Sequence, residues 1–582
     1  DGNYAISAKA GDVLKISFIG MKTQMVTVGT SNTINVTMIE DLEDLDTVVI
    51  TGYQNIEREL FTGASQSVKA EDIELAGLPD ITQSLEGRAA GVSVQNVSGT
   101  FGAAPRITIR GSASILGNAD PIWIVDGVIQ EQIVNVSFAD LVSGDPNTLL
   151  SSAIAGLNAN DIENFEILKD ASATSLYGAR AQNGVIVITT KSGRKNQAPT
   201  FSYNGDFLMR DRPRYAQYNL LNSQETISVY RELESKGFLQ YPDVLSGRNG
   251  GVYNIRANAI NNYNETNGAF GGWSIADRVR RITANFRNSF HFNEDKLIFT
   301  LLGSANIVNQ NAPGTLARQN DTFFGAFNRE FDINPFNYSL TTSRALRPRD
   351  QNGDLEYYRA NWAPINILNE IENNTLEINR TDIKFQGQIE YKINDNLTYK
   401  FLGSARYVQN LGENAARANS NRVSAYRAAE NAIVRNANTF LFDDPDDPVA
   451  LPRVVLPSGG ILTETKNTLT AYTFRNSLQY DKTFNDVHNL NVYFNQEYRY
   501  ADRTSSSNTG YGYQFDRGGS IFTDPDILRK VILEGDDYFF SQDTRSREVS
   551  LAMQVNYDFD RKYVLSVTGN YEGSNRAGES SS

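Results

Sequence analysis

From about residue 200 onward, apolar and polar residues alternate in long, regular runs, and no other feature constrains the fold of this chain as strongly. Successive side chains of an extended strand point to opposite sides, so such alternation places two different surfaces on two faces. In residues 282–292 the apolar face is Ile282, Ala284, Phe286, Phe290 and Phe292, and the polar face is Thr283, Asn285, Arg287, Ser289 and His291. The pattern predicts half-buried antiparallel β-strands.

The connections between these runs differ sharply in length. Some are turns of a few residues, at 293–295, 394–396, 484–486 and 558–561. The others are roughly forty to seventy residues long, well beyond the usual loop of a compact domain. Short turns at one end, long loops at the other and aromatic residues near strand ends are typical of outer-membrane barrels. Charged residues on the polar face, such as Arg287, Lys384 and Glu390, would then face the water-filled lumen.

We therefore predict a mainly β fold, a transmembrane antiparallel β-barrel whose first part occupies residues 196–582. Roughly nine strands are recognisable. An open edge in lipid would leave backbone groups unpaired, so further strands are expected beyond these residues. The chain also begins in mid-pattern at Asp1, and we expect its natural start to lie upstream.

Composition excludes several classes of function. The formal charge of −14 argues against nucleic acid as a partner. Without cysteine the 582 residues hold no disulfide, thiolate nucleophile or Cys-ligated metal. The two histidines, His291 and His488, both lie in alternating runs, which argues against a two-histidine metal site. No run approaches the roughly 20 apolar residues that a membrane helix needs.

Residues 157–193 carry a different pattern, a helix signal, a strand, a second helix and a strand. Asn160 and Asp161 can cap a first turn, FEILKD alternates, and GVIVITT is a β-branched run suited to a buried strand. Asn183 and Gly184 form a turn pair before that run. These residues predict a small, tightly packed α/β unit.

Upstream of it, short elements alternate with turn residues. We predict a strand over 66–70 and a helix over 80–90, with Asp80 as its N-cap and Gly91 at C′. VSVQNV and RITIRG are alternating strands, and PIWIVDGV is an apolar run after a proline. Trp123, within that run, is assigned to core packing rather than to stacking on a sugar.

Three stretches resemble one known family. LNANDIENFEILKDASATSLYGARAQNGVIVITTKSG (157–193), RITIRGSASILGNADPIWIVDGV (106–128) and ITQSLEGRAAGVSV (81–94) resemble the plug domain of SusC/RagA-family TonB-dependent outer-membrane transporters, in that family's order. The resemblance implies an α/β plug domain at residues 54–195, held inside the barrel, which would have about 22 strands when complete. DGNYAISAKAGDVLKISFIGMKTQ resembles part of a carboxypeptidase-regulatory-like domain, so residues 1–40 are predicted to form a partial β-sandwich, with four short strands recognisable.

Residues 41–53 are assigned as an acidic linker and a TonB box. A short β-prone strand after a charged linker can pair with the exposed edge of another sheet, because main-chain hydrogen bonds give such pairing its affinity. The resemblance implies that TonB captures this strand; the alternative is an ordinary plug strand. The predicted TonB-binding residues are Asp46, Thr47, Val48, Val49, Ile50, Thr51, Gly52 and Tyr53.

Four charged residues of the predicted plug, Arg106, Arg110, Asp126 and Arg180, suggest catalysis at first sight. No nucleophile–base pair accompanies them, so we assign them to plug architecture, as contacts that hold the plug in a polar lumen. Substrate contact is the alternative for Arg110 and Asp126. The chain is not expected to be an enzyme.

Two acidic loops are candidate calcium sites. Residues 350–356, DQNGDLE, lack the full twelve-residue ligand pattern, and we interpret them as an Asn-Gly turn. Residues 443–447, DDPDD, are interpreted as a solvated loop. No cofactor is therefore expected, with calcium in the extracellular loops as the alternative. Tyrosine and asparagine in the long loops would suit sugars and peptides equally.

The resemblance implies TonB-dependent active import of oligosaccharides or oligopeptides across the outer membrane, with plug displacement driven through the TonB box. It implies as partners TonB with its inner-membrane energising complex, a SusD-like surface lipoprotein, outer-membrane lipid, and a dimeric transporter–lipoprotein assembly. The location would be the outer membrane of a Gram-negative, Bacteroidetes-like bacterium, with plug and N-terminal domain toward the periplasm and long loops at the cell surface. The alternative function is a surface scaffold or export-associated binding barrel, in which transport is secondary.

Overall fold

The computed structural model describes residues 6–9, 11–18, 21–29, 33–36, 48–58, 61–70, 81–95, 105–111, 120–133, 153–154, 157–193, 202–203, 205, 221–236, 278–314, 319–320, 327–328, 348–360, 362–485 and 487–575. Some predictions fall outside these residues. They concern the acidic linker at 41–45, Asp46 and Thr47 of the predicted TonB box, the helix cap Asp80 and the turn residue Asp486.

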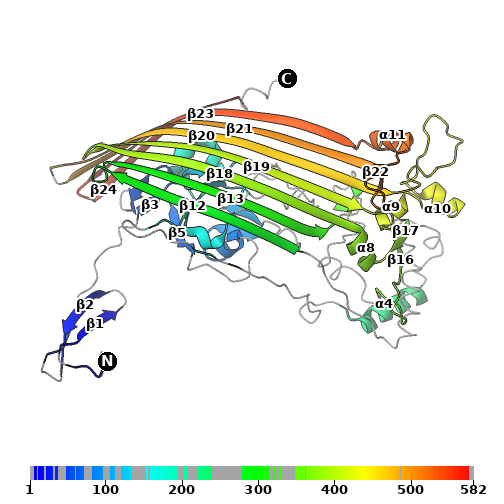
Figure 1. Cartoon of the computed structure of the whole chain (residues 1–582), viewed down its shortest axis with the longest axis horizontal. Coiled ribbons are helices and arrows are strands. Elements are labelled where there is room, and N and C mark those ends of the chain that lie inside the picture. Colours follow the sequence, from blue (N-terminus) through cyan, green and yellow to red (C-terminus); the bar gives the residue numbers. More distant parts are fainter. Residues whose placement is uncertain are drawn as a thin grey trace.

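A nine-stranded antiparallel sheet dominates the described part of the chain (Figure 1). Its strands follow one another in sequence order, from β12 to β24, with the short β22 paired to β21. The strands are β12 (Arg278–Phe292), β13 (Leu297–Pro313), β18 (Asn374–Asn394), β19 (Leu397–Ala416), β20 (Gly460–Phe484), β21 (His488–Gln514), β22 (Ser520–Ile521), β23 (Phe539–Phe559) and β24 (Tyr563–Ser574). The mainly β architecture predicted from the alternating runs is confirmed.

Tight turns join these strands at one end of the sheet. Asn293, Glu294 and Asp295 all have positive φ, and so do Asn485 and Asp560 in two other turns. Asn and Asp tolerate this left-handed region better than most residues, which is why the sequence concentrates them there. The predicted short turns are therefore confirmed.

The two faces of the sheet differ as the alternation predicts. Phe286, Phe385 and Met553 on one face are 52%, 58% and 48% exposed, an apolar surface of the kind that lipid covers. On the other face Arg287 and Lys384, both predicted to face the lumen, contact a smaller unit that lies against the sheet.

That smaller unit, which we call the plug, lies on the inner side of the large sheet (Figure 1). Its five-stranded sheet has the order β5-β10-β11-β8-β9, with β10 antiparallel to both neighbours and β11 parallel to β8. Two hairpins, β3–β4 and β6–β7, complete it. The strands are β3 (Val48–Ile50), β4 (Asn55–Glu57), β5 (Ser65–Lys69), β6 (Val92–Gln95), β7 (Arg106–Ile109), β8 (Ile122–Val125), β9 (Val128–Ile129), β10 (Ile162–Leu168) and β11 (Val185–Thr190).

Strands β10 and β11 bury both of their faces, as their β-branched and apolar residues favour. Phe165 and Ile167 lie in one core cluster, which also contains Trp123. Leu168 lies in a second cluster, which contains Tyr53 and Tyr177. The alternation of FEILKD thus separates two cores.

The helical parts of the plug are short. The first helix signal is a 3-10 turn, η4 (Ala159–Asp161), and the second is α3 (Ala171–Thr174) continued by the 3-10 segment η5 (Ser175–Asn183). The Asp170 carboxylate accepts the Ala173 N–H at 2.8 Å and caps α3. The predicted order of helix, strand, helix and strand is confirmed, with tighter helices than expected.

The α-helix predicted over 80–90 is wrong in extent and type. The structure has the 3-10 helix η2 (Ile81–Leu85), followed by turns. Gly87 adopts φ +69°, and this left-handed residue ends the helical run early. Gly91 has φ +76°, the left-handed conformation expected of it.

At the N-terminus the structure shows one hairpin, β1 (Val13–Phe18) and β2 (Met21–Thr27). The sequence predicts strands at YAISA (4–8) and TINVTMI (33–39), but their described residues, 6–8 and 33–36, are not in strands. A two-stranded hairpin is too small to form a stable sandwich, since strands need further partners to bury a face. The partial sandwich at residues 1–40, and the domain boundaries generally, stay predictions.

The described parts of the long connections form a cap at the other end of the sheet (Figure 1). Its own core includes Val423, Leu456 and Ile527, from three separate stretches. No helix of the described residues is long and apolar enough to cross a membrane. The elements of the loops are α4 (Ser223–Ser235), β14 (Gln319–Asn320), β15 (Phe327–Asn328), β16 (Tyr358–Ala360), β17 (Ala363–Ile365), α8 (Ile367–Asn373), α9 (Asn421–Ala425), α10 (Ala432–Ala437) and α11 (Pro525–Leu533).

Candidate functional site: the interface between plug and sheet

The described part of the predicted TonB box, residues 48–53, forms the first strand and turn of the β3–β4 hairpin. The Thr51 N–H donates to the Gln54 carbonyl at 3.0 Å and closes the turn. Gly52 has φ +80°, and a Cβ there would lie 2.8 Å from the Tyr177 hydroxyl. Val48 is 41% exposed, whereas Val49 is 3% exposed. The segment is therefore docked on the plug, with its first described residue open to solvent.

Tyr53 lies between an aromatic ring and a cation. Its ring stacks on Tyr177, with centroids 4.4 Å apart and planes at 20°. The Arg475 guanidinium lies 3.9 Å from the same ring centroid, and because both groups cannot occupy one face, they cover opposite faces. The Tyr53 hydroxyl donates to Glu497 Oε1 at 3.4 Å. Burial raises the pKa of the Tyr53 phenol and Glu497 raises it further, so the hydroxyl stays a donor.

A second contact holds the same hairpin. The Tyr177 hydroxyl donates to the Thr51 carbonyl, next to Gly52. The Gln54 side chain also reaches the large sheet, where its Nε2 donates to Gln554 Oε1 at 2.6 Å. The hairpin is thus attached both to the plug and to the sheet.

Arg475, on β20, connects the hairpin to the rest of the interface. Its Nε donates to Glu497 Oε2 at 2.6 Å, and its Nη2 donates to the Gly127 carbonyl at 2.8 Å. Its Nη1 lies 3.5 Å from the Gly52 carbonyl, which it also donates to. Arg475 and Glu497 are direct neighbours in the β20–β21 register, so the strand pairing itself brings the two charges together.

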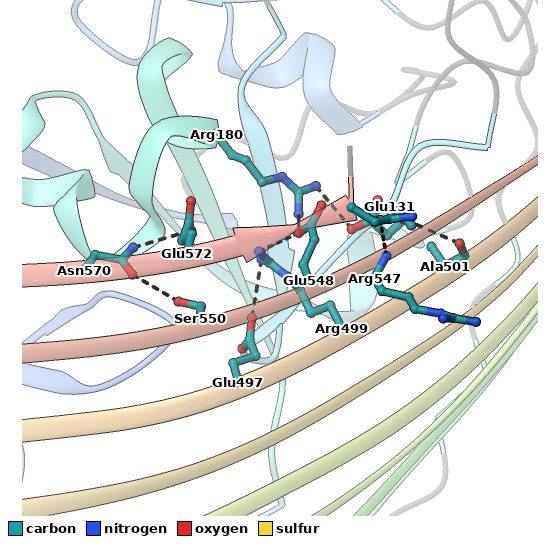
Figure 2. A network of polar contacts seen from close by, with 12 residues as sticks. Glu131, Arg180, Glu497, Arg499, Ala501, Arg547, Glu548, Ser550, Asn570 and Glu572 are labelled. Carbon is teal, nitrogen blue, oxygen red and sulfur yellow. Dashed lines mark hydrogen bonds and ion pairs between the residues drawn. The ribbon is translucent and has the colours of Figure 1, made fainter. Parts of the chain in front are cut away.

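The ionic contacts continue from Glu497 along β21. Arg499 Nη1 lies 3.4 Å from Glu497 Oε1, and its Nη2 lies 2.8 Å from Glu548 Oε2. Arg499 and Glu548 are again cross-strand neighbours, in the β21–β23 register. Figure 2 shows Arg499 between the two glutamates.

From Glu548 the contacts return to the plug. Arg180 Nη1 lies 2.7 Å from Glu548 Oε2, and its Nη2 lies 3.2 Å from Glu131 Oε1 (Figure 2). Glu131 Oε2 lies 2.6 Å from Arg503 Nη2 of β21. We call this set the ion-pair chain; its members in order are Arg475, Glu497, Arg499, Glu548, Arg180, Glu131 and Arg503.

The two plug members of the ion-pair chain are both charged at neutral pH. Burial alone would raise the pKa of Glu131, but the charges of Arg180, Arg503 and Arg499 outweigh burial and lower the pKa to about 2. Burial likewise opposes the charge on Arg180, yet Glu131 and Glu548 raise the pKa of Arg180 above its usual value. Each of these two charges is therefore stabilised by its oppositely charged neighbours in the ion-pair chain.

The turn between β8 and β9 is a second attachment point. Asp126 has φ +50°, and its carboxylate accepts the Thr190 N–H at 3.0 Å and lies 3.6 Å from Arg287 Nη1 of β12. Its own carbonyl accepts a hydrogen bond from Gln386 Nε2 of β18 at 2.8 Å. Lys384, two residues earlier on β18, donates to the Val125 carbonyl at 3.3 Å. Strand side chains thus hold the backbone of this turn.

A third attachment lies beside Glu131. Arg406 Nη1 of β19 donates to the Glu131 carbonyl at 3.2 Å, and its Nη2 donates to the Ala153 carbonyl at 3.1 Å. Asp382, on the neighbouring β18, holds Arg406 with an oxygen 2.7 Å from Nη2 and also pairs with Arg380. At the second and third attachments the strands supply the donors and the plug supplies the acceptors, whereas at the hairpin Tyr53 and Gln54 of the plug donate to the sheet.

The structure separates the four plug residues that the sequence grouped together. Asp126 and Arg180 contact the large sheet. Arg106 lies within the plug, where its charge opposes the rise that burial causes in the pKa of Asp120. Arg110, at φ +59°, donates its N–H to the Gly91 carbonyl, and it makes none of the ion pairs found among the described residues. The assignment of the four to plug architecture stays a prediction.

Sequence reasoning missed most of the interface. The missed residues are Glu131, Tyr177, Asp382, Arg406, Arg475, Glu497, Arg499, Arg503, Glu548 and Gln554. One signal was available, because Glu497, Arg499 and Arg503 fall on the polar face of a strand whose other face carries Phe494 and Tyr498. Several charges of both signs on one lumen-facing side indicate a charged partner.

The described residues contain no group of three or more acidic or histidine side chains placed to hold a metal ion. In the loop at 350–356 the Asp350 carboxylate accepts the N–H groups of Asn352 and Asp354, each at 2.9 Å, and Gly353 has φ +90°. These bonds close the loop as a turn. Calcium binding in the loops stays an untested alternative.

Comparison with known proteins gives a match in the plug. The family model of the TonB-dependent receptor plug domain matches residues 58–185. This range starts after the β3–β4 hairpin and ends at the start of β11.

Two curated relatives resemble this chain over different lengths. The TonB-dependent receptor SusC of Bacteroides thetaiotaomicron is 39% identical over 205 residues, which are 35% of this chain and 19% of SusC. The TonB-dependent receptor P3 of Formosa agariphila is 25% identical over 603 aligned positions, covering 99% of this chain and 51% of P3. Nearly all of this chain therefore aligns with P3, but it spans only about half the length of that relative.

The fold is also that of a solved transporter. The structure of the RagAB peptide transporter superimposes with a TM-score of 0.57 at 18% sequence identity, over 88% of this chain and 56% of the solved chain. The likeness includes both the plug and the large sheet, since it extends over nearly all of the chain.

Proposed function

We propose that this chain, a SusC/RagA-like TonB-dependent receptor of the outer membrane, forms the plug and part of the barrel wall of an active importer. Its relatives are receptors and transporters rather than enzymes. The cargo that we propose is an oligosaccharide or an oligopeptide. The solved relative is named a peptide transporter, but 18% identity supports the common fold and not a common cargo.

The observation that carries the proposal is the position of the 48–57 hairpin. It stands immediately before the matched plug domain, exposes Val48, and reaches the sheet through Tyr53 and Gln54. A pull on residues 46–53 by TonB would therefore act first on the contacts between plug and sheet. TonB would bind by pairing a strand with this segment, starting at the exposed Val48.

The chemistry of the interface suits a plug that must move. Many of its contacts are ion pairs and hydrogen bonds, which water can replace once the plug shifts. Apolar contacts are present as well, for example between Ile133 of the plug and Val408 and Leu469 of the sheet. A continuous apolar interface would instead expose apolar surface to water in the lumen during every cycle. The polar lumen therefore permits the plug to leave its position and return.

Partners follow from the same proposal. TonB and its inner-membrane energising complex would act at the hairpin, and a SusD-like surface lipoprotein would cover the cap at the loop end, in a dimeric assembly. A surface scaffold remains the second candidate function, since a folded loop cap with its own apolar core would serve binding without transport.

The test is deletion of residues 46–53 from the full-length protein in its native host, which is then grown on separate glycans and peptides. We expect loss of growth on one nutrient class while binding of that nutrient and the amount of receptor in the outer membrane are unchanged. Deletion of residues 41–45 is the matched control, because it shortens the acidic linker and leaves the strand. Unchanged growth on every nutrient, with the protein still in the outer membrane, would reject import and favour the scaffold.

A further inference from the structure

The ion-pair chain links two parts of the plug through residues of the large sheet. Its first member, Arg475, covers the ring of Tyr53, and Glu131, next to its last member Arg503, lies two residues after β9. Tyr53 and Glu131 are about eighty residues apart in the sequence, and the contacts through the sheet connect them.

Each glutamate of the ion-pair chain is shared by two guanidinium groups. Glu548 Oε2 accepts from Arg180 at 2.7 Å and from Arg499 at 2.8 Å (Figure 2). Glu497 Oε1 is shared between Arg499, at 3.4 Å, and the Tyr53 hydroxyl, at 3.4 Å. Arg499 therefore stands between two acceptors, nearer to Glu548 than to the oxygen that binds Tyr53.

We infer that Arg499 moves between Glu548 and Glu497 and thereby decides whether the hairpin at 48–57 stays docked. When Glu131 is drawn away from Arg180, Arg180 turns fully to Glu548 and displaces Arg499. Arg499 then turns to Glu497 Oε1 and displaces the Tyr53 hydroxyl. A shift of residues 120–133 would in this way loosen the hairpin on which TonB acts; this regulation rests on the proposed function.

The inference predicts opposite results for two substitutions that break the same ion pair. Glu131→Gln removes the negative charge that shares Arg180 with Glu548. Arg180 then pairs with Glu548 alone, so Arg499 is displaced and the hairpin loosens. Arg180→Gln removes the competitor for Glu548, so Arg499 remains there and Tyr53 keeps its acceptor. An ion pair that merely stabilised the plug would give loosening in both variants.

The test uses a thiol at Val49, which is buried in the docked hairpin. The 582 residues contain no cysteine, so Val49→Cys in the full-length protein, with any cysteine outside these residues replaced, gives a single reporter. The measurement is the initial rate of maleimide labelling of the purified transporter in detergent. The Tyr53→Ala variant serves as the reference for the labelling rate of a hairpin that is no longer docked.

We expect Glu131→Gln to label at least about fivefold faster than the parent, the effect of losing one hydrogen bond of ordinary strength. We expect Arg180→Gln to label at the parent rate or more slowly. The matched control is Glu390→Gln, which breaks the Glu390–Lys400 pair on β18 and β19, outside the ion-pair chain. Its labelling rate should equal that of the parent.

Faster labelling in both Glu131→Gln and Arg180→Gln, or in neither, would overturn the inference. That outcome leaves the proposed function intact, because import is judged separately by growth after deletion of residues 46–53. Conversely, opposite labelling with unaffected growth after the deletion would keep the coupling and reject import. A melting curve of each variant identifies a global loss of fold, and Glu131→Asp, which retains the charge, should restore the parent rate.

Discussion

Two buried glutamates show how differently the plug interface and the loop cap are stabilised. Glu131 lies among the guanidinium groups of Arg180, Arg503 and Arg499, and its pKa is about 2. Glu370, in α8 of the cap, is fully buried, and burial raises its pKa to about 7. Both carboxyls have lost water, so their neighbours account for the difference.

The partners of Glu370 are neutral. Its Oε1 accepts the Asn421 N–H at 2.8 Å and the Asn369 Nδ2 at 3.2 Å. Neutral donors oppose the effect of burial only in part, whereas full positive charges reverse it. At the interface, positive neighbours therefore keep a buried carboxyl charged, whereas the hydrogen-bonded and apolar surroundings in the cap favour a neutral carboxyl.

The largest effect should come from removing one charge of the interface. Glu497→Leu leaves Arg475 and Arg499 buried without their common acceptor, which typically costs about 3–5 kcal/mol. We expect the plug to become sensitive to trypsin at a clearly lower urea concentration. Adding Arg475→Met should recover part of the loss, and a double variant as labile as the single one would show that the charges do not act as a pair.

A smaller and opposite effect is expected in the cap. The folded pKa of Glu370 lies above the unfolded value of 4.5, so its contribution to stability is intact below pH 4.5 and is lost as pH rises toward 7. The loss by pH 7 is about 3 kcal/mol for a shift of this size. Glu370→Gln, which mimics the neutral acid, should slow hydrogen exchange in α8 at pH 7.5 and leave it unchanged at pH 4.5.

The interface should respond to pH in the other direction. The folded pKa of Glu131 lies below its unfolded value of 4.5, so its stabilisation is present above pH 4.5 and is lost as pH falls toward 2. Parallel pH profiles of plug proteolysis and of α8 exchange would separate the two regions. If both regions lost stability in the same direction of pH change, the proposed difference between the interface and the cap would be wrong.

The smallest effect should come from a solvated ion pair on the same sheet. Glu390 and Lys400 lie 3.1 Å apart and are each about one-third exposed. Exposed pairs contribute roughly 0–1 kcal/mol, so Glu390→Gln should shift the urea midpoint of plug proteolysis very little. A loss as large as that of Glu497→Leu would mean that burial does not distinguish the two pairs.

Much of the fold could be predicted because its signals are local. The alternation in 282–292 assigns each side chain to a face before any partner is known, and the turn at 293–295 needs only residues that tolerate positive φ. The helix over 80–90 failed for a local reason too, because Gly87 adopts a left-handed conformation that the apolar pattern did not reveal.

The site was only partly predictable, since its geometry depends on pairing across the chain. Arg180 and Asp126 were singled out, but nothing near them in sequence indicates Glu548 or Arg287 as their partners. Tyr53 was assigned by its place before the plug, and its contacts with Tyr177 and Arg475 could not be foreseen.

The sequence by itself determined the strand pattern, the turns and the resemblance of the plug, because backbone periodicity and turn chemistry act between residues close in the chain. Only the tertiary structure decided which charges meet. Strand register sets Arg475 against Glu497 and Arg499 against Glu548, and the docking of the plug adds Arg180 and Glu131. A one-residue slip in register would turn these charges to the opposite face, so the site exists only once the sheet and the plug have assembled.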